Sequence, residues 1–197
     1  MMSEIVFKSA FDAVRFALCY SSQQYGETIL AKHVDASKKG SGMGLVGLDG
    51  AAQVGMIRRE IESLSELHLA VIVARAAPRQ LPCDCGRPCC SHWRPNGEWQ
   101  AAVAWLTDAS MAHCSGCSHY RVRRAIIEKT FGAKVNLVDI AHTCGVHINT
   151  VSKHNTTIRK WLDGDQRTGT TGVMQAAWAK LEQRFIEIGL VETNAAT

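Results

Sequence analysis

The sequence predicts an all-α fold: a helical bundle with an inserted cysteine-rich segment and a C-terminal helix-turn-helix. Apolar residues recur at three- and four-residue steps in several segments, side chains that favour helix starts precede these segments, and glycines follow them. We expect four regions: an N-terminal helical region (1–80), a cysteine-rich region (81–120), a helix-turn-helix domain (118–163) and a C-terminal packing helix (171–192).

Two long amphipathic helices are expected in the N-terminal region. The first runs from about Ser3 to about Tyr25, and the second runs from Asp49 to about Ala76, where Pro78 ends it. Each carries a stripe of apolar residues along one side. We therefore expect both helices to pack into a core rather than to stand in solvent.

Six of the eight cysteines fall into two clusters that flank one predicted helix. That helix is capped by Asn96 and runs from Glu98 to about Met111, with Trp99 and Val103 among its inward residues. The first cluster comes before it and the second directly after it: Cys83, Cys85, Cys89 and Cys90, then Cys114 and Cys117.

These two clusters predict a zinc-binding region. The start of the chain does not resemble a secretory signal, so we expect a reducing cytosol, in which disulfides are disfavoured. The CxxC pair and the upstream knuckle would each donate two thiolates to one tetrahedral Zn²⁺. The first-cluster pair is left open, with Cys85 plus Cys89 or Cys90 favoured. A second metal or mixed ligation also stays open, since three histidines lie nearby: His92, His113 and His119.

We expect this zinc to be structural and the protein not to be an enzyme. A catalytic zinc keeps an open coordination position and a nearby general base, whereas surplus thiolates close a site. The deaminase pattern of HxE followed by PCxxC does not occur. Cys114 and Cys117 also lack the strand-helix context of a thiol oxidoreductase.

The segment Val135–Leu162 has the spacing of a helix-turn-helix. Asn136 can cap a short helix, Ala141 is the small residue where the two helices meet, and Gly145 suits the left-handed turn. Asn149 is a candidate cap for the second helix. The inward residues of that helix would be Val151, Ile158, and Trp161 or Leu162. His154 falls near a position that is usually apolar, and an inward His154 would change the register of the outward residues.

Positive charge is concentrated on this part of the chain. The segment Ser118–Leu162 holds eight Lys or Arg and two acidic residues, so it carries +6 of a chain whose net charge is +4. The remainder carries −2, and such segregation is typical of phosphate contact. A support helix from Ser118 to about Phe131 would hold Tyr120 inward and three arginines outward.

The expected DNA contacts fall into two groups. Five residues of the second helix would reach base edges in the major groove: Asn149, Thr150, Ser152, Lys153 and Thr156. Five cationic residues would contact phosphates: Arg121, Arg123, Arg124, Arg159 and Lys160.

The last part of the chain predicts a linker and one more helix. Asp163–Thr171 is polar and contains glycine, which is typical of a linker. Gly172–Ile188 is strongly amphipathic, with an apolar row from Val173 through Leu181 to Ile188. We expect this row to pack on its own domain, with dimerisation or a protein partner as the alternatives.

The segment GVHINTVSKHNTTIRKWL resembles the second half of the helix-turn-helix in sigma-factor region 4, although His154 and Asn155 depart from that pattern. Together with an N-terminal helical part and a cysteine-rich insertion, it resembles small phage and prophage transcription regulators, in particular the Q-type late antiterminators of lambdoid phages. The resemblance implies a promoter-proximal site on double-stranded DNA and engagement of host RNA polymerase.

The sequence therefore predicts a zinc-stabilised, sequence-specific DNA-binding transcription regulator in the cytoplasm of a bacterial host cell. It has no run of about 18 apolar residues, so no membrane span is expected. Two alternatives stay open. One is a zinc-stabilised protein-interaction module, and the other is a nucleic-acid enzyme such as a recombinase, for which no paired-carboxylate cluster is evident.

Overall fold

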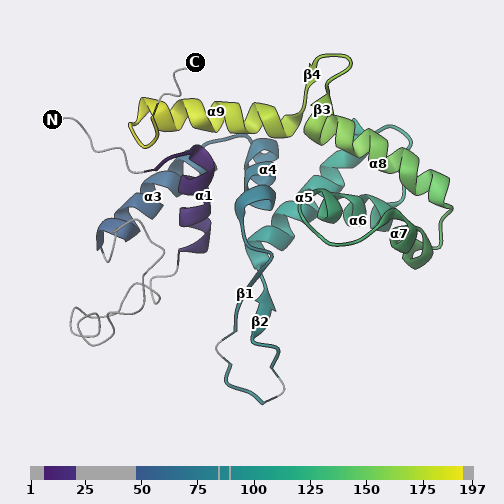
Figure 1. The fold of residues 1–197 in the computed structure, drawn as a ribbon, viewed down its shortest axis with the longest axis horizontal. Helices are drawn as coiled ribbons and strands as arrows, with labels where there is room; N and C mark the ends of the chain where they lie inside the picture. Colours follow the sequence, from purple (N-terminus) through teal and green to yellow (C-terminus); the bar gives the residue numbers. More distant parts are fainter. Residues whose placement is uncertain (1–6, 21–47, 84, 89, 193–197) are drawn as a thin grey trace. The chain divides into compact units, whose positions relative to one another are not determined.

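The computed structural model describes residues 7–20, 48–83, 85–88 and 90–192 (Figure 1). Within these residues the fold is mostly helical, with eight helices and four short strands. The predicted helical class is confirmed, and the strands are an addition to it. The chain divides into two compact units, Met1–Ser63 with Lys180–Thr197, and Leu64–Ala179. None of the described helices is long and apolar enough to cross a membrane.

In the first unit, α1 (Ala10–Cys19) packs against α3 (Leu48–Glu62). Ser9 caps α1 by accepting a hydrogen bond from the Asp12 amide, and the chain turns extended at Tyr20. The predicted helix from Ser3 to Tyr25 is therefore too long at both described ends. Its remaining residues, 3–6 and 21–25, lie outside the described part of the chain.

The end of α9 (Val173–Glu187) completes this unit. Leu181 and Phe185 are fully buried, and Arg184 pairs with Glu60 at 3.3 Å and contacts Ser63. Beyond the helix, Val191 forms a parallel bridge with Phe7. The predicted apolar row is thus buried at Leu181 and Phe185, whereas Ile188 is 42% exposed.

The helix predicted from Asp49 to Ala76 is in fact two helices, α3 and α4 (Glu66–Ala76). The Ser63 hydroxyl donates to the Glu60 carbonyl at 2.7 Å, and Ser65 is extended at the start of α4. Serine side chains compete with backbone hydrogen bonds in this way and favour helix ends. Because apolar residues recur at helical spacing across both helices, the sequence pattern does not reveal the break between them.

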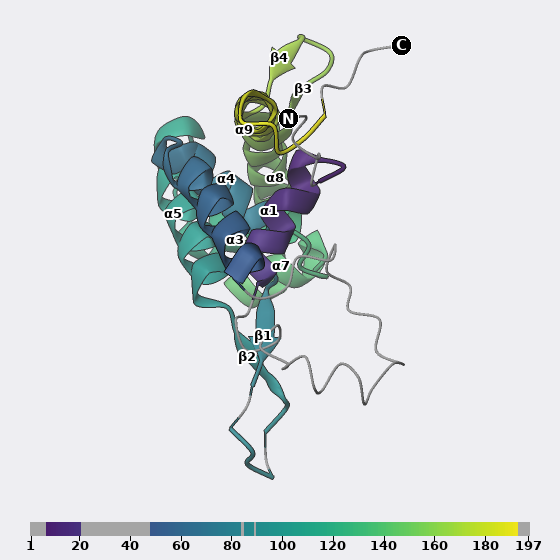
Figure 2. The ribbon, with the colours of Figure 1, turned by 90° about the vertical axis from the view of Figure 1, so that its left-hand side faces the viewer.

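In the second unit, α4 lies alongside α5 (Gly97–His113), as Figures 1 and 2 both show. The predicted cap Asn96 is confirmed, since its side chain accepts from the Glu98 amide at 3.0 Å. The Trp99 indole donates to the Ala74 carbonyl at 3.1 Å. An antiparallel hairpin, β1 (Gln80–Pro82) with β2 (Trp93–Pro95), connects α4 to α5 and pairs Leu81 with Arg94.

Three further helices follow α5 in this unit: α6 (Tyr120–Thr130), α7 (Leu137–Cys144) and α8 (Ile148–Asp163). α6 packs against α5, α7 and α8, and α7 packs against α8. Their shared core consists of fully buried aliphatic side chains: Val122, Ile126, Ile127, Val151, Ile158 and Leu162. Tyr120, predicted to point inward, is 43% exposed because it stands in the first turn of α6.

The predicted linker is wrong. α8 continues to Asp163, and a tight hairpin follows it, with β3 (Gly164–Asp165) antiparallel to β4 (Thr170–Thr171). Gly164 has φ +85°, and a Cβ there would collide with the Thr170 carbonyl oxygen. This close approach of the two strands requires glycine.

Candidate nucleic-acid interface and candidate metal centre

The predicted cap of α7 and the predicted glycine turn between α7 and α8 are both confirmed. Asn136 caps α7 by accepting from the Asp139 amide at 2.8 Å, and Gly145 ends the helix with φ +65° and ψ +33°. The Val146 amide returns to the Ala141 carbonyl at 3.0 Å. Ala141 is buried, as expected of the small residue where the two helices meet.

The start of α8 differs from the prediction. Its cap is His147, whose Nδ1 accepts from the Asn149 amide at 3.2 Å, so Asn149 is not the cap but a residue of the first turn. A histidine is not among the side chains that favour this position. The cap predicted from the sequence therefore lies two residues after the observed cap.

α8 has one buried stripe and one exposed polar face. The buried residues recur at three- and four-residue steps: Val151, His154, Ile158 and Leu162. The predicted DNA contacts of this helix are all exposed: Asn149, Thr150, Ser152, Lys153, Thr156, Arg159 and Lys160. The outward set keeps its register although His154 faces the core, because His154 simply continues the stripe between Val151 and Ile158.

A shallow groove of about 580 Å³ runs between α8 and the turn that connects α5 to α6. Ser115 and Gly116 form one wall, and Thr150, Ser152 and Lys153 line the α8 side. His154 forms part of the groove as well, with its Nε2 3.1 Å from the Gly116 carbonyl oxygen. The exposed face of α8 is therefore bordered by backbone from another element.

The predicted phosphate contact of Arg123 is wrong. Arg123 is 2% exposed, and its guanidinium donates to three carbonyl oxygens, those of Thr107 at 3.2 Å, Cys117 at 2.6 Å and Ser118 at 2.7 Å. From α6 it reaches the Thr107 carbonyl of α5 and the Cys117 and Ser118 carbonyls of the turn between α5 and α6. Its charge predicted a position on the surface. In the structure, these carbonyl oxygens accept its hydrogen bonds, and the side chain is buried.

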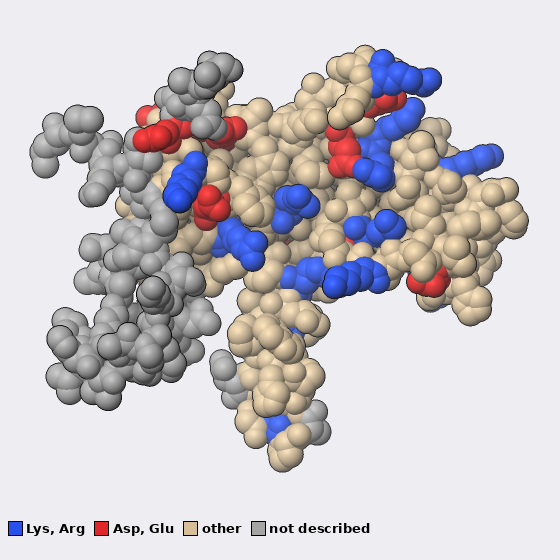
Figure 3. Space-filling model, in the orientation of Figure 1, with Lys and Arg blue, Asp and Glu red and all other residues tan. Residues whose placement is uncertain are grey.

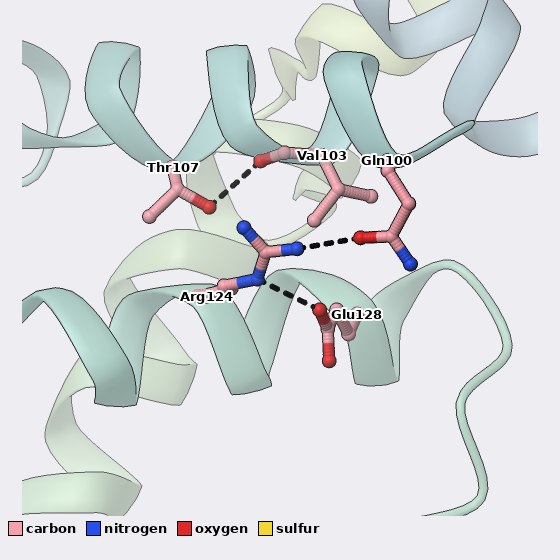
Figure 4. Close-up of polar contacts among 5 residues, drawn as sticks. All are labelled: Gln100, Val103, Thr107, Arg124 and Glu128. Atoms are coloured by element: carbon pink, nitrogen blue, oxygen red, sulfur yellow. Dashed lines mark hydrogen bonds and ion pairs between the residues drawn. The ribbon is translucent and has the colours of Figure 1, made fainter. Parts of the chain in front are cut away.

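Arg124 is half-buried and held by two side chains (Figure 4). Its Nη2 donates to Gln100 Oε1 at 2.6 Å and its Nε donates to Glu128 Oε1 at 3.0 Å. Desolvation lowers the pKa of Arg124, but Tyr120 and Glu128 outweigh this effect and raise it. Arg124 therefore has less freedom to contact a phosphate than Arg121, which is exposed.

Two cations at the end of α8 form exposed ion pairs. Arg159 Nε lies 3.0 Å from Asp163 Oδ2, and Lys160 Nζ lies 3.1 Å from Asp165 Oδ2. Exposed pairs of this kind contribute about 0–1 kcal/mol, so phosphates can compete for the cations. In the view of Figure 3, Lys and Arg side chains lie over the region of α5, α6 and α8.

Three of the predicted zinc ligands converge at the tip of the β1–β2 hairpin. The Sγ atoms of Cys83, Cys85 and Cys90 all lie within 4.8 Å of one another and could hold a metal ion. In the described part of the chain, this is the one group of three or more metal-ligating side chains that is so close. Cys89 lies outside the described residues.

Each of these thiols accepts a backbone N–H from the residue two positions later. Cys83 accepts from Cys85, Cys85 from Arg87, and Cys90 from His92, whose N lies 3.3 Å from the sulfur. The Arg87 amide, then the Cys90 and Cys83 thiols, lower the pKa of Cys85. The Cys85 amide lowers the pKa of Cys83, but the thiols of Cys85 and Cys90 outweigh it and raise that pKa.

The two cysteine clusters do not share one site, so the predicted pairing of the clusters is wrong. The hairpin precedes α5 and the Cys114–Cys117 turn follows it, and a helix of 17 residues is about 25 Å long. One ion with ligands 2–2.5 Å away cannot bridge that length. Cys114 and Cys117 are buried in their turn.

Sequence reasoning missed the hairpin, and it expected an inward His154 to change the register of the outward residues, which the structure contradicts. Gln80–Pro82 and Trp93–Pro95 bracket the first cysteine cluster, and this bracketing is the signal that could have indicated a hairpin knuckle.

Comparisons of the chain with protein families, with curated proteins and with solved structures each found no match.

Proposed function

We propose that this protein is a sequence-specific DNA-binding transcription regulator in which α8 enters the major groove. One observation carries the proposal: α8 follows a glycine turn, buries one apolar stripe and exposes an uninterrupted face of hydrogen-bonding and cationic side chains. An α-helix fits the major groove, and such side chains match the donors and acceptors of base edges.

The residues of α8 then divide by position. Thr150, Ser152 and Lys153 stand on the groove side and are assigned to base edges, with Asn149 and Thr156 beside them. Phosphate contacts are assigned to Arg121, which is exposed on α6, and to the weakly paired Arg159 and Lys160. Arg124 is a secondary phosphate contact, because its guanidinium must first leave Gln100 or Glu128.

The metal role proposed for the hairpin is structural. Cys83, Cys85 and Cys90 supply three thiolate ligands, and the favoured metal for such a set is Zn²⁺. Backbone N–H groups already point at the sulfurs, which orients them and lowers the energy of their charged form. Catalysis is not part of the proposal.

Selection of bound fragments from the native genome tests the DNA-binding proposal, followed by transcription in vitro across the bound site with purified RNA polymerase. We expect a small set of fragments that share one sequence, and a change in transcript length or amount that depends on the protein. Recovery of fragments without a shared sequence would reject sequence-specific reading, and would favour a zinc-stabilised protein-interaction module.

A further inference from the structure

Cys114 and Cys117 form a buried pair of thiols in a tight turn. They are 1% and 3% exposed, and the Cys117 amide donates to the Cys114 carbonyl at 3.2 Å. Gly116, between them, has φ +78°. Burial, with the neighbouring Cys117 thiol, raises the pKa of Cys114 to about 11. Two buried thiols in one CxxC turn can supply half of a tetrahedral metal centre.

His154 brings a nitrogen to this turn from α8. Its Nε2 lies 3.1 Å from the Gly116 carbonyl oxygen, which can only accept, so Nε2 carries the hydrogen. In the neutral imidazole Nδ1 then has a free lone pair, and this atom is buried without a hydrogen-bond partner in the described part of the chain. Metal-ligating histidines have this arrangement, with one ring N–H on a backbone carbonyl and the other nitrogen on the metal.

His119 supplies a second such nitrogen. It stands two residues after Cys117, at the start of α6, and its Nδ1 is also buried with no hydrogen-bond partner among the described residues. Buried polar atoms without partners are rare and call for an explanation such as an ion. The nearby His113 differs, because it is exposed and its ring stacks on Trp161 with centroids 5.2 Å apart.

We infer that Cys114, Cys117, His119 and His154 form a second metal site, a tetrahedral centre for Zn²⁺ or a similar dication. Unlike the hairpin thiols, no three of these four ligand atoms lie within 4.8 Å of one another, so ligation must draw the side chains together. Binding releases one proton from each thiol and involves no oxidation. The guanidinium of Arg123, which donates to the Cys117 carbonyl, partly balances the two thiolate charges.

Such a site would fix α8 against the turn between α5 and α6. Three of its ligands lie on that turn and at the start of α6, and the fourth lies on α8. It also accounts for a polar residue in the apolar stripe of α8, where packing alone favours an aliphatic side chain. The inference does not depend on DNA binding.

Cobalt titration of the full chain tests this site. In a variant with Cys83, Cys85, Cys89 and Cys90 all replaced by serine, we expect one equivalent of Co²⁺, tetrahedral visible bands and a charge-transfer intensity of two thiolates. Adding Cys114→Ser and Cys117→Ser should abolish binding. Cys144→Ser, at a half-buried thiol on α7, is the matched control and should leave binding unchanged.

His154→Gln keeps the test decisive where the cysteine variants do not fold. A glutamine amide can still donate to the Gly116 carbonyl but cannot replace the imidazole as a ligand, so Co²⁺ affinity should fall at least about tenfold while helix content is retained. Three results would overturn the site: less than half an equivalent of Co²⁺ in the folded variant without the hairpin cysteines, unchanged affinity in His154→Gln, or a Cys114–Cys117 disulfide in protein purified under reducing conditions.

Discussion

Arg123 donates its Nε hydrogen to the Thr107 carbonyl oxygen across 3.2 Å, and this buried guanidinium joins α6 to α5. Its Nη1 donates to the carbonyls of Cys117 and Ser118 at the end of the connecting turn. One side chain therefore joins backbone carbonyls of α5 and of the turn that follows it. Arg123 supports the position of the interface instead of contacting a ligand.

Arg123→Ala should destabilise the protein by about 2–4 kcal/mol, because three hydrogen bonds from one buried, charged donor are lost. Arg121→Ala, two residues earlier and exposed, is the control and should change stability by less than about 0.5 kcal/mol. Urea denaturation of the metal-loaded proteins measures both. Equal effects of the two substitutions would contradict the structural role of Arg123.

Gly164→Ala should destabilise the protein by about 2–4 kcal/mol, because a left-handed backbone and a collision with the Thr170 carbonyl act together. Gly169, in the same hairpin, also has a positive φ, but a Cβ there meets nothing within 4 Å. Gly169→Ala should therefore cost only about 1–2 kcal/mol. Urea midpoints compare the two, and a smaller loss for Gly164→Ala would refute the close approach.

Features with local causes were predicted well from the sequence. Asn136 and Asn96 cap their helices, Gly145 ends α7, and Val151 and Ile158 are buried at helical spacing. Each of these outcomes depends on a few neighbouring residues. The predicted outward face of α8 is exposed for the same reason.

Features with distant causes were not predicted. Arg123 turns inward because carbonyls of α5 and of the connecting turn accept its hydrogens. The two cysteine clusters were joined in one site although a helix was predicted between them, because the sequence does not show that, of the cysteines the structure describes, only Cys83, Cys85 and Cys90 converge, on the β1–β2 hairpin before α5. The β1–β2 hairpin pairs strands that are too short to have a detectable alternation.

The Lys160–Asp165 pair should make stability depend on pH in the acid range. The hydrogen bond from Lys160, then the Arg167 amide, lowers the pKa of Asp165 from its ordinary value of 3.8. The pair therefore contributes above that value, and its contribution is lost as pH falls through the lower folded pKa. Asp165→Asn should lower Tm slightly at pH 7, and the difference from the parent should vanish in strong acid.

Calorimetry across pH 2–7 checks the Asp165 prediction, with Asp108→Asn, at an exposed position on α5, as the control. A Tm difference for Asp165→Asn that stays constant down to the lowest pH would show that the loss has another cause.

Replacing Cys83, Cys85 and Cys90 by serine should remove one equivalent of zinc, measured by elemental mass spectrometry on protein without a histidine tag. An isolated two-stranded hairpin is marginally stable, so we expect disorder confined to it. Helical circular dichroism should be retained, because α5 separates the hairpin from α6, α7 and α8. A wide loss of helix would show that the hairpin metal supports the whole unit.

The DNA-reading role of α8 is tested most directly by the affinity of Lys153→Ala for a genome-selected DNA site, measured against salt concentration. If Lys153 reads a base edge, affinity for that site should fall by about 1–3 kcal/mol, and base substitutions at one position should no longer matter. Lys180→Ala, at an exposed lysine of α9, should bind as the parent does. Unchanged affinity and unchanged base preference in Lys153→Ala would contradict the proposal.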